Sequence, residues 1–183
     1  MRGTLETIVG AMFAGKTSEL LKRILWAKHQ EKKILVIKPS IDNRYAEKLI
    51  VTHNNLSHEC YSMRDWEQTN LDHQLTKKNY DVVFLDEIHF METTSTLDNV
   101  EKMLNFEIDV ICAGLDQDSR GKPWETSSFL LGLSDKITKI YGFCNVCGIE
   151  ATKTYRKVEG GGRTQVGAAN IYEPRCLKHW KAR

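Results

Sequence analysis

Long apolar runs are absent from this 183-residue chain, and its clusters of like charge are short. Because no stretch of about 18 apolar residues occurs, the sequence predicts no membrane span and no membrane partner. The opening residues MRGTLETIVG run straight into an apolar segment and leave no room for a signal peptide, which favours a cytoplasmic location. The formal net charge is +2 and the basic residues form no extended face, so we expect no nucleic-acid partner.

Cysteine is also scarce, and five is an odd number that does not suit a disulfide framework. Three of the five stand in the spacing of a metal site. Cys60 and Cys112 lie in apolar surroundings, where we expect buried and unreactive thiols. Hydrophobic residues make up 41% of the chain, which is enough for the core of one domain of ordinary size with a small appendage.

Short apolar segments alternate with amphipathic ones along most of the chain, which predicts an α/β fold with a parallel sheet covered on both faces. We expect strands over residues 6–10, 32–39, 80–87 and 106–116, and helices over 16–30, 63–79 and 95–106. The apolar face of the first helix is expected to include Leu21 and Leu25. From about residue 137 short β-like runs replace the helices, so we expect a nucleotide-binding core over 1–136 and a small β subdomain over 137–183.

A complete phosphate-binding loop, GAMFAGKT, stands between the first strand and the first helix and matches G-x-x-x-x-G-K-[ST]. Its glycines let the backbone N–H groups surround a phosphate, Lys16 can reach the β- and γ-phosphates, and Thr17 offers a hydroxyl ligand to Mg²⁺. The N-terminus of the following helix also favours an anion. The expected phosphate-binding residues are Gly10, Ala11, Met12, Phe13, Ala14, Gly15, Lys16 and Thr17.

A second half of the nucleotide site is expected where the apolar run Val82–Leu85 ends in Asp86 and Glu87. A carboxylate at the end of a buried strand suits a partner for Mg²⁺, which is the role expected for Asp86. Neighbouring residues of a strand point to opposite faces, so Glu87 is expected to face the acceptor and to orient its hydroxyl or a water. Glu87 as a surface or helix-capping residue is the alternative.

Two pairs of potential metal ligands, each with two residues between its members, occur in the C-terminal part. Three thiolates and one imidazole in this spacing predict a closed, structural zinc site. Free thiols, or a redox pair of the first two cysteines, are the alternatives. The pairs are Cys144 with Cys147 and Cys176 with His179.

Taken in order, the motifs GAMFAGKTSELLKR, DEIHF and GLDQDSRGKPW, and the zinc pairs that flank a Gly-rich stretch, closely resemble the cellular, poxviral and bacterial type of thymidine kinase. The resemblance extends over nearly the whole chain. It implies a RecA-like P-loop core and transfer of the ATP γ-phosphate to the 5′-hydroxyl of thymidine to give dTMP, with deoxyuridine as a further acceptor. It also implies Mg²⁺ with ATP, a structural zinc and a homotetramer.

The resemblance assigns Glu87 as the proton acceptor and places Phe90 on the thymine ring. It implies a zinc-anchored loop over residues 157–175 that closes over the base. Its implied substrate-binding residues are Met12, Phe90, Leu115, Ser119, Trp124, Gln165, Val166, Gly167, Ala168 and Tyr172, and Asp42, Asn43 and Arg44 are implied beside the sugar and phosphates.

Three positions depart from the family pattern. His89 stands where glutamine is usual, Ser119 replaces an aromatic residue, and Gly167-Ala168 replaces a Gly-Gly pair. The loss of the aromatic at Ser119 removes a wall of the base pocket, which Trp124 could rebuild; alternatively, Trp124 is a core aromatic.

Two other classes of function fit parts of the sequence. A RecA-like ATPase with a nucleic-acid-binding zinc unit would use Glu87 to activate water, but the chain has no basic-aromatic patch and no second motor lobe. A zinc-bearing interaction module would transfer no phosphate at all. Turnover that depends on thymidine separates the kinase from both.

Overall fold

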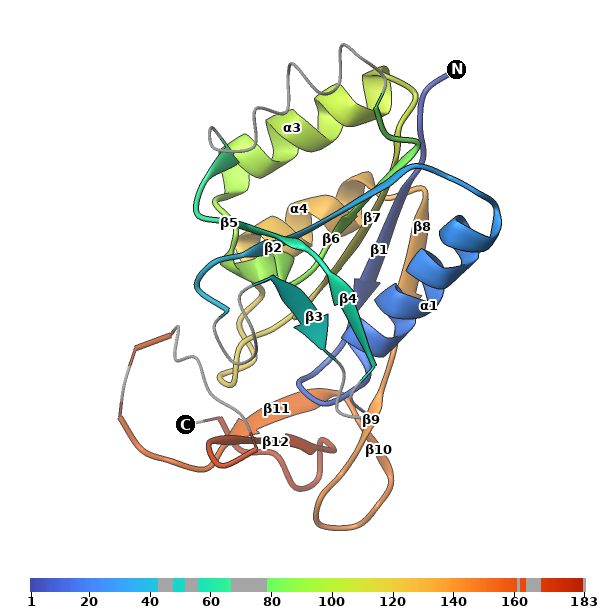
Figure 1. Ribbon diagram of the computed structural model, residues 1–183. Coiled ribbons are helices and arrows are strands. Elements are labelled where there is room, and N and C mark those ends of the chain that lie inside the picture. The colour runs from blue at the N-terminus through green and yellow to red at the C-terminus, as the bar shows by residue number, and fades with distance from the viewer. Residues whose placement is uncertain (43–47, 52–55, 67–78, 161, 164–168, 183) are drawn as a thin grey trace.

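Six strands form the central sheet in the order β5-β2-β6-β7-β1-β8, and every neighbouring pair is parallel. Figure 1 shows this computed structural model, which describes residues 1–42, 48–51, 56–66, 79–160, 162–163 and 169–182. The strand β1 that precedes the phosphate loop is separated from β6 by one strand, β7. The strands are β1 (Leu5–Val9), β2 (Ile34–Pro39), β5 (Tyr61–Met63), β6 (Val82–Leu85), β7 (Asp109–Gly114) and β8 (Lys136–Lys139).

Both faces of the central strands are buried, which explains the apolar runs over residues 34–37 of β2 and Val82–Leu85 of β6. Successive side chains of β6 alternate between two apolar clusters: Val83 and Leu85 pack in one, and Val82 and Phe84 pack in the other. Each cluster is completed by helices from one side of the sheet. The sheet is therefore the middle layer of three, and its strands all end at one edge.

Helix α1 (Lys16–His29) covers one face, and α3 (Thr93–Asn105) and α4 (Glu125–Leu133) cover the other (Figure 1). The expected apolar face of α1 is correct at Leu21, which is buried. It is wrong at Leu25, whose side chain is exposed, because the buried stripe continues through Ala27 instead.

Strand β5 and helix α4 are among the elements that were not predicted. The three-residue strand β5 is too short to give a periodic signal. Helix α4 carries an irregular pattern in which Ser127 is buried and Phe129 is half exposed, so its sequence lacks an amphipathic stripe. The helix expected over 63–79 lies mostly outside the described residues, although Trp66 at its start is buried and donates from Nε1 to Thr96 Oγ1 at 2.9 Å.

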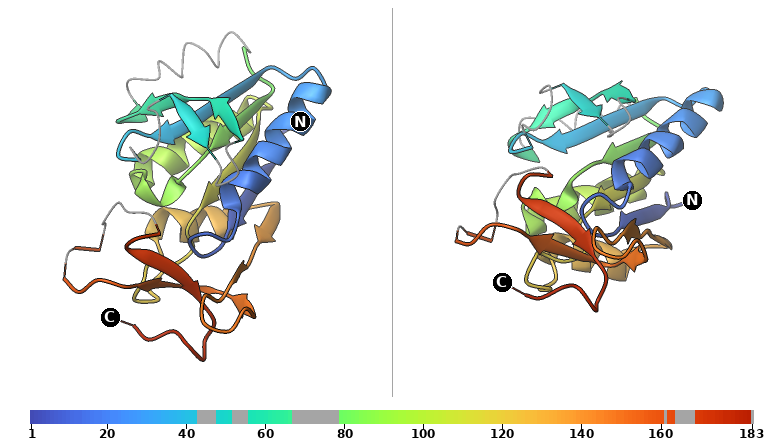
Figure 2. Two further views of the ribbon diagram at one scale, coloured as in Figure 1. Left: turned by 60° about the horizontal axis from the view of Figure 1, so that its bottom comes forward. Right: turned by 90° about the horizontal axis from the view of Figure 1, so that it is seen from below.

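Small antiparallel sheets make up most of the C-terminal part. They lie across the end of the main sheet to which β1 points, next to the phosphate loop (Figure 1, Figure 2). The predicted start of this part at residue 137 falls inside β8, which belongs to the main sheet, so the division into two units stays a prediction. The paired strands are β9 (Gly142–Phe143) with β10 (Glu150–Ala151), β11 (Lys153–Arg156) with β12 (Tyr172–Arg175), and, elsewhere in the chain, β3 (Leu49–Val51) with β4 (Ser57–Glu59).

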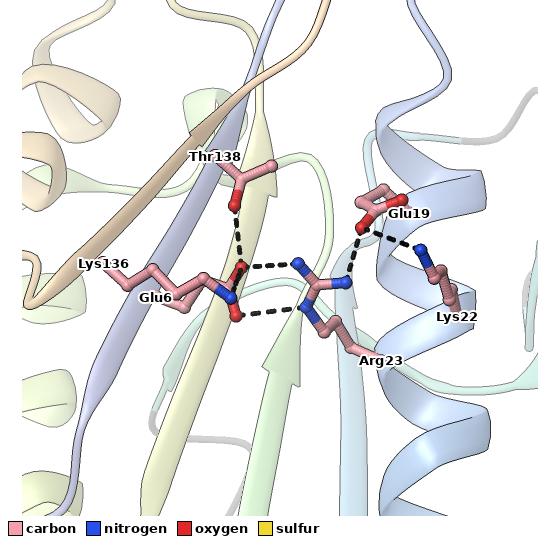
Figure 3. A network of polar contacts seen from close by, with 6 residues as sticks. All are labelled: Glu6, Glu19, Lys22, Arg23, Lys136 and Thr138. Atoms are coloured by element: carbon pink, nitrogen blue, oxygen red, sulfur yellow. Dashed lines mark hydrogen bonds and ion pairs between the residues drawn. The ribbon is translucent and has the colours of Figure 1, made fainter.

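A buried ion pair fastens α1 to the sheet. Arg23 donates from Nε and Nη2 to the two carboxylate oxygens of Glu6 on β1, at 3.2 and 2.9 Å (Figure 3). Thr138 Oγ1 also donates to this carboxylate at 2.9 Å, and Lys136 Nζ lies 3.1 Å from it. Burial alone would raise the pKa of Glu6, but these donors outweigh burial and lower it. The network connects β1, β8 and α1, the elements on either side of the phosphate loop.

Replacing Arg23 with methionine is expected to lower the free energy of unfolding by about 3 kcal/mol at pH 7, because a buried carboxylate loses its two-pronged partner. Lys22→Ala is the matched control: Lys22 lies 3.8 Å from Glu19 on the surface and its loss should cost less than about 1 kcal/mol. The lowered pKa of Glu6 means that its stabilisation is complete above the ordinary value of 4.5 and is lost as the pH falls through the lowered pKa. Urea unfolding at pH 7 and pH 3 measures both effects. Equal losses in the free energy of unfolding for the two variants would contradict a stabilising role of the Arg23–Glu6 ion pair.

Candidate functional site

The phosphate loop has the backbone geometry that its glycines predict. Gly15 adopts φ +93° as the residue before α1, and a side chain on Gly10 would place its Cβ 2.4 Å from the carbonyl oxygen of Ile140. Phe13 also has a positive φ, 63°, which is uncommon for a residue with a side chain and marks a locally strained loop. Helix α1 begins at Lys16 directly after Gly15, and the first N–H groups of a helix favour an anion.

Lys16, Thr17 and Asp86 meet beside the loop. Lys16 is buried and its Nζ donates to the carbonyl oxygen of Ala11 at 2.8 Å, so the ammonium lies against the loop backbone. Thr17 Oγ1 donates to Asp86 Oδ2 at 3.3 Å. A hydroxyl next to a buried carboxylate provides oxygen ligands that suit Mg²⁺. The metal ion and the ammonium of Lys16 would together neutralise negative charge on a triphosphate.

Asp42 belongs to the same region. It is buried just beyond β2, and its charge, together with those of Asp86 and Lys38, acts on the thiol of Cys60. Burial is the main cause that raises the pKa of Cys60, to about 11, so this thiol stays protonated at neutral pH. The expectation of an unreactive Cys60 agrees with this pKa, although the residue is half-buried rather than buried.

Glu87 follows Asp86 but does not continue the strand. β6 ends at Leu85, and Glu87 has φ 53° and ψ 40°, a left-handed conformation, immediately before a short 3-10 helix (Ile88–Phe90). The two carboxylates were expected to point to opposite faces because they follow one another on a strand, and this reason is wrong. A left-handed turn separates them instead, and Asp86 accepts a hydrogen bond from the Glu87 amide at 3.0 Å, which stabilises that turn.

Aromatic rings lie next to Glu87. The ring centroids of Phe90 and Trp124 are 6.2 Å apart with a steep interplanar angle of 69°, and the imidazole of His89 packs against both rings, 4.1 Å from Phe90 and 5.3 Å from Trp124. Arg163 stacks on Trp124, with 4.4 Å from the guanidinium carbon to the ring. Leu115 is buried beside this group and donates its amide to His89. Trp124 thus belongs to an aromatic cluster beside Glu87 rather than to the apolar core.

Ser119 and its neighbours form a tight turn held by Asp118. Asp118 Oδ1 accepts from the amides of Arg120 and Lys122 at 3.0 and 2.9 Å, and Asp118 Oδ2 accepts from Arg163 Nε at 2.9 Å. The carbonyl oxygen of Ser119 accepts from the indole of Trp180 at 3.3 Å. This turn connects the DQDSRGKPW segment to the C-terminal part of the chain, so the position at Ser119 is fixed without an aromatic side chain.

The sequence analysis missed two residues on β11. Thr154 Oγ1 accepts a hydrogen bond from the amide of Met12 at 3.0 Å and so joins the C-terminal part to the phosphate loop. Arg156, two residues further on the same face, is buried beside Tyr172, its partner on β12. Its Nη1 donates to the carbonyl of Gly162 at 3.1 Å, whereas its Nε and Nη2 are buried and have no partner in the described part of the chain. The strand alternation of β11 was a signal that could have found them.

The four predicted metal ligands lie together, with their ligand atoms within 4.8 Å of one another. Cys147 Sγ is 3.8 Å from Cys176 Sγ, and His179 Nδ1 is 3.7 Å from Cys144 Sγ and 3.3 Å from Cys176 Sγ. Tetrahedral zinc with bonds of about 2.3 Å to sulfur and about 2.0 Å to nitrogen would require separations of about 3.8 and 3.5 Å. The cluster therefore fits a zinc site.

The pKa shifts of the cysteine thiols are compatible with the binding of a metal cation at this cluster. Burial would raise the pKa of Cys144, but N–H groups of Cys176, Val146 and Cys147 together with His179 lower it to about 5, which favours a thiolate at neutral pH. For Cys147 the Ile149 amide lowers the pKa, but burial and the neighbouring sulfurs outweigh it and raise the pKa. Several sulfurs this close ionise together only when a metal ion balances their charge.

Six of the residues named from the resemblance fall outside the described residues, and their roles stay predictions. They are Gln165, Val166, Gly167 and Ala168, with Asn43 and Arg44 on the phosphate side. Of the described substrate-side residues, Met12 lies in the phosphate loop, Phe90 ends the 3-10 helix that follows Glu87, Leu115 directly follows β7, and Tyr172 begins β12.

Residues 3–180 match the family described as Thymidine kinase. The chain belongs to the thymidine kinase family. This family consists of ATP-dependent nucleoside kinases, which are nucleotide-binding transferases, and the match extends from before the first strand to the residue after His179. In the described residues no helix is long and apolar enough to cross a membrane.

Solved structures similar to the chain include a replication initiator DnaA bound to AMPPCP and single-stranded DNA, at 16% identity and a TM-score of 0.46, with 75% of this chain and 40% of that chain covered. AMPPCP-bound DnaA from Aquifex aeolicus matches at 15% identity and a TM-score of 0.43, over 77% of this chain and 41% of that chain. Domain III of Thermotoga maritima DnaA matches at 13% identity and a TM-score of 0.41, over 76% and 55%. The chain spans less than half the length of the first two.

Proposed function

We propose that this protein transfers the γ-phosphate of ATP to the 5′-hydroxyl of thymidine and gives dTMP. The observation that carries the proposal is the left-handed turn that presents Glu87 beside Asp86, next to a phosphate loop, in a member of the thymidine kinase family. A metal-side carboxylate and a separate acceptor-side carboxylate are what phosphoryl transfer to an oriented hydroxyl requires.

Each residue then has one task. Lys16 and the loop amides hold the β- and γ-phosphates, and Thr17 and Asp86 would hold Mg²⁺, which when bound neutralises charge that develops on the phosphate oxygens. Glu87 accepts the proton of the 5′-hydroxyl while the hydroxyl oxygen forms a bond to the γ-phosphorus. The bond from that phosphorus to the bridging oxygen breaks, and ADP leaves with the electron pair. Most of the rate enhancement comes from positioning and charge, because the transition state needs little covalent help.

Buried donors without partners support a pyrimidine acceptor. In the described part of the chain, Trp124 Nε1 and two nitrogens of Arg156 are buried and unpaired. Such donors are costly unless a ligand supplies acceptors, and the two carbonyl oxygens of thymine or uracil are acceptors. Deoxyuridine is therefore a proposed second substrate. The lack of an aromatic side chain at Ser119 leaves Phe90 and Trp124 as the proposed walls for the base.

The remaining features are proposed on the same family grounds. A zinc ion held by the Cys/His cluster would anchor a loop over residues 157–175, and the protein would act as a cytoplasmic homotetramer without nucleic acid.

A nucleoside panel with ATP and Mg²⁺ tests the function. We expect turnover that requires thymidine, weaker turnover with deoxyuridine, and no stimulation by DNA or RNA. The same panel with Ser119→Phe is expected to favour thymidine more strongly, because the added ring narrows the pocket. ATP turnover that responds to nucleic acid and not to thymidine would instead identify a RecA-like ATPase, and no phosphate transfer to any nucleoside would indicate a binding module.

A further inference from the structure

His89 is a titratable side chain in contact with Glu87, and the mechanism above does not use it. It lies in the 3-10 helix after Glu87 and is buried, with only 1% of its side chain exposed. Its Nε2 is 3.5 Å from Glu87 Oε2. A buried imidazole in contact with the proposed proton acceptor can either fill space or control that carboxylate.

The backbone determines which nitrogen of His89 carries the proton. The amide of Leu115 donates to His89 Nδ1 at 3.1 Å. Because an amide N–H can only donate, Nδ1 must offer a lone pair, so the ring is neutral and its proton is on Nε2. The Nε2–H of His89 therefore faces the Glu87 carboxylate. An ionised carboxylate has no proton to donate, so it can only accept this hydrogen bond.

The ring has little freedom to turn away. Phe90 and Trp124 pack against it, and a Cβ added to Gly114 on β7 would lie 3.3 Å from His89 Nδ1 and 2.6 Å from Ile88 Cγ1. The absence of a side chain at Gly114 is what lets the 3-10 helix approach β7 closely enough for the Leu115 amide to reach the imidazole. The donor is thus held in place from three sides.

We propose that His89 is a positioning residue: its Nε2–H holds the Glu87 carboxylate in the orientation that accepts the 5′-hydroxyl proton. This inference rests on the proposed function. The present 3.5 Å separation is longer than a formed hydrogen bond, and the contact shortens when the acceptor is bound, as is common for catalytic hydrogen bonds. His89 transfers no proton itself.

Two substitutions separate this role from simple packing. His89→Phe keeps a ring of similar size but removes both nitrogens, and we expect kcat to fall roughly tenfold to a hundredfold with an unchanged KM for ATP, because the base is misplaced. His89→Gln keeps one acceptor for Leu115 and one donor for Glu87, and it should stay within about threefold of the wild type. Thermal unfolding and ATP binding confirm that each variant is folded.

A double-mutant cycle with Glu87→Gln is the decisive measurement. If His89 acts through the Glu87 carboxylate, His89→Phe should change kcat by less than about twofold in the Glu87→Gln background. Equal losses in both backgrounds, or a wild-type kcat for His89→Phe, would overturn the proposal and leave the kinase assignment intact. A wild-type enzyme without thymidine-dependent turnover would instead contradict the proposed function.

The tautomer is measured independently of activity. In the ¹⁵N-labelled wild-type protein, His89 Nε2 should give a pyrrole-type signal and Nδ1 a pyridine-type signal near neutral pH. Two pyrrole-type nitrogens, as in an imidazolium, would exclude the hydrogen bond from Leu115 and with it the proposed orientation. This result does not depend on whether His89→Phe folds.

Discussion

Replacing Glu87 with glutamine is expected to lower kcat by roughly 10² to 10⁴-fold while ATP binding is retained. The amide has the shape of the carboxylate, but it cannot take the proton of the 5′-hydroxyl. The phosphate loop and Asp86 are untouched by the change, so the nucleotide should still bind. Rapid-quench measurement of dTMP formation, together with calorimetric titration of ATP, tests both parts.

The left-handed backbone at Glu87 calls for a matched control. Glu31 also has a positive φ, 57°, but it is exposed at the end of α1, far along the helix from the phosphate loop. Glu31→Gln makes the same chemical change in the same backbone conformation and should leave kcat within about twofold. If Glu87→Gln had the modest effect of Glu31→Gln, Glu87 would not be the proton acceptor.

Local sequence predicted the parts of the fold that depend on local chemistry. Strands β2 and β6 carry apolar runs, β1 and β7 are short and largely apolar, and α1 and α3 have a helical period. The phosphate loop matches one contiguous motif. Helix α4 could not be predicted in this way, because Ser127 is buried in it while Phe129 is exposed. Its position is set by packing against the sheet, which a window of sequence does not contain.

The candidate site residues show the same difference between features of local sequence and features of the fold. Residue types and spacing were enough to nominate Lys16, Thr17 and Asp86, because each belongs to one contiguous motif. The left-handed turn at Glu87, the hydrogen bond from Leu115 to His89 and the buried guanidinium of Arg156 depend on segments that meet only in the fold. The sequence could therefore indicate the residues proposed to bind ATP more readily than those proposed to bind the acceptor.

Removing Cys176, a proposed zinc ligand, is expected to abolish zinc binding and to unfold the C-terminal sheets while the main sheet survives. The third apolar cluster of the described chain consists of Cys144, Ala151 and Cys176, so two of its three members belong to the proposed zinc site. Such a cluster cannot by itself offset the entropy of ordering four short strands. Zinc binding in small zinc domains supplies on the order of 10–16 kcal/mol, which is the missing stabilisation.

Metal analysis and amide hydrogen exchange measure the two consequences of Cys176→Ser together. We expect zinc to fall from one per chain to none, and the protection of β11 and β12 to be lost while β1 and β7 keep theirs. Cys60→Ser is the control for the loss of a thiol outside the cluster and should keep its zinc. Thymidine phosphorylation should fall with Cys176→Ser as well, because β11 supplies Thr154, which accepts from the Met12 amide in the phosphate loop. Retained protection of β11 and β12 in a zinc-free protein would mean that the metal does not hold this part of the fold in place.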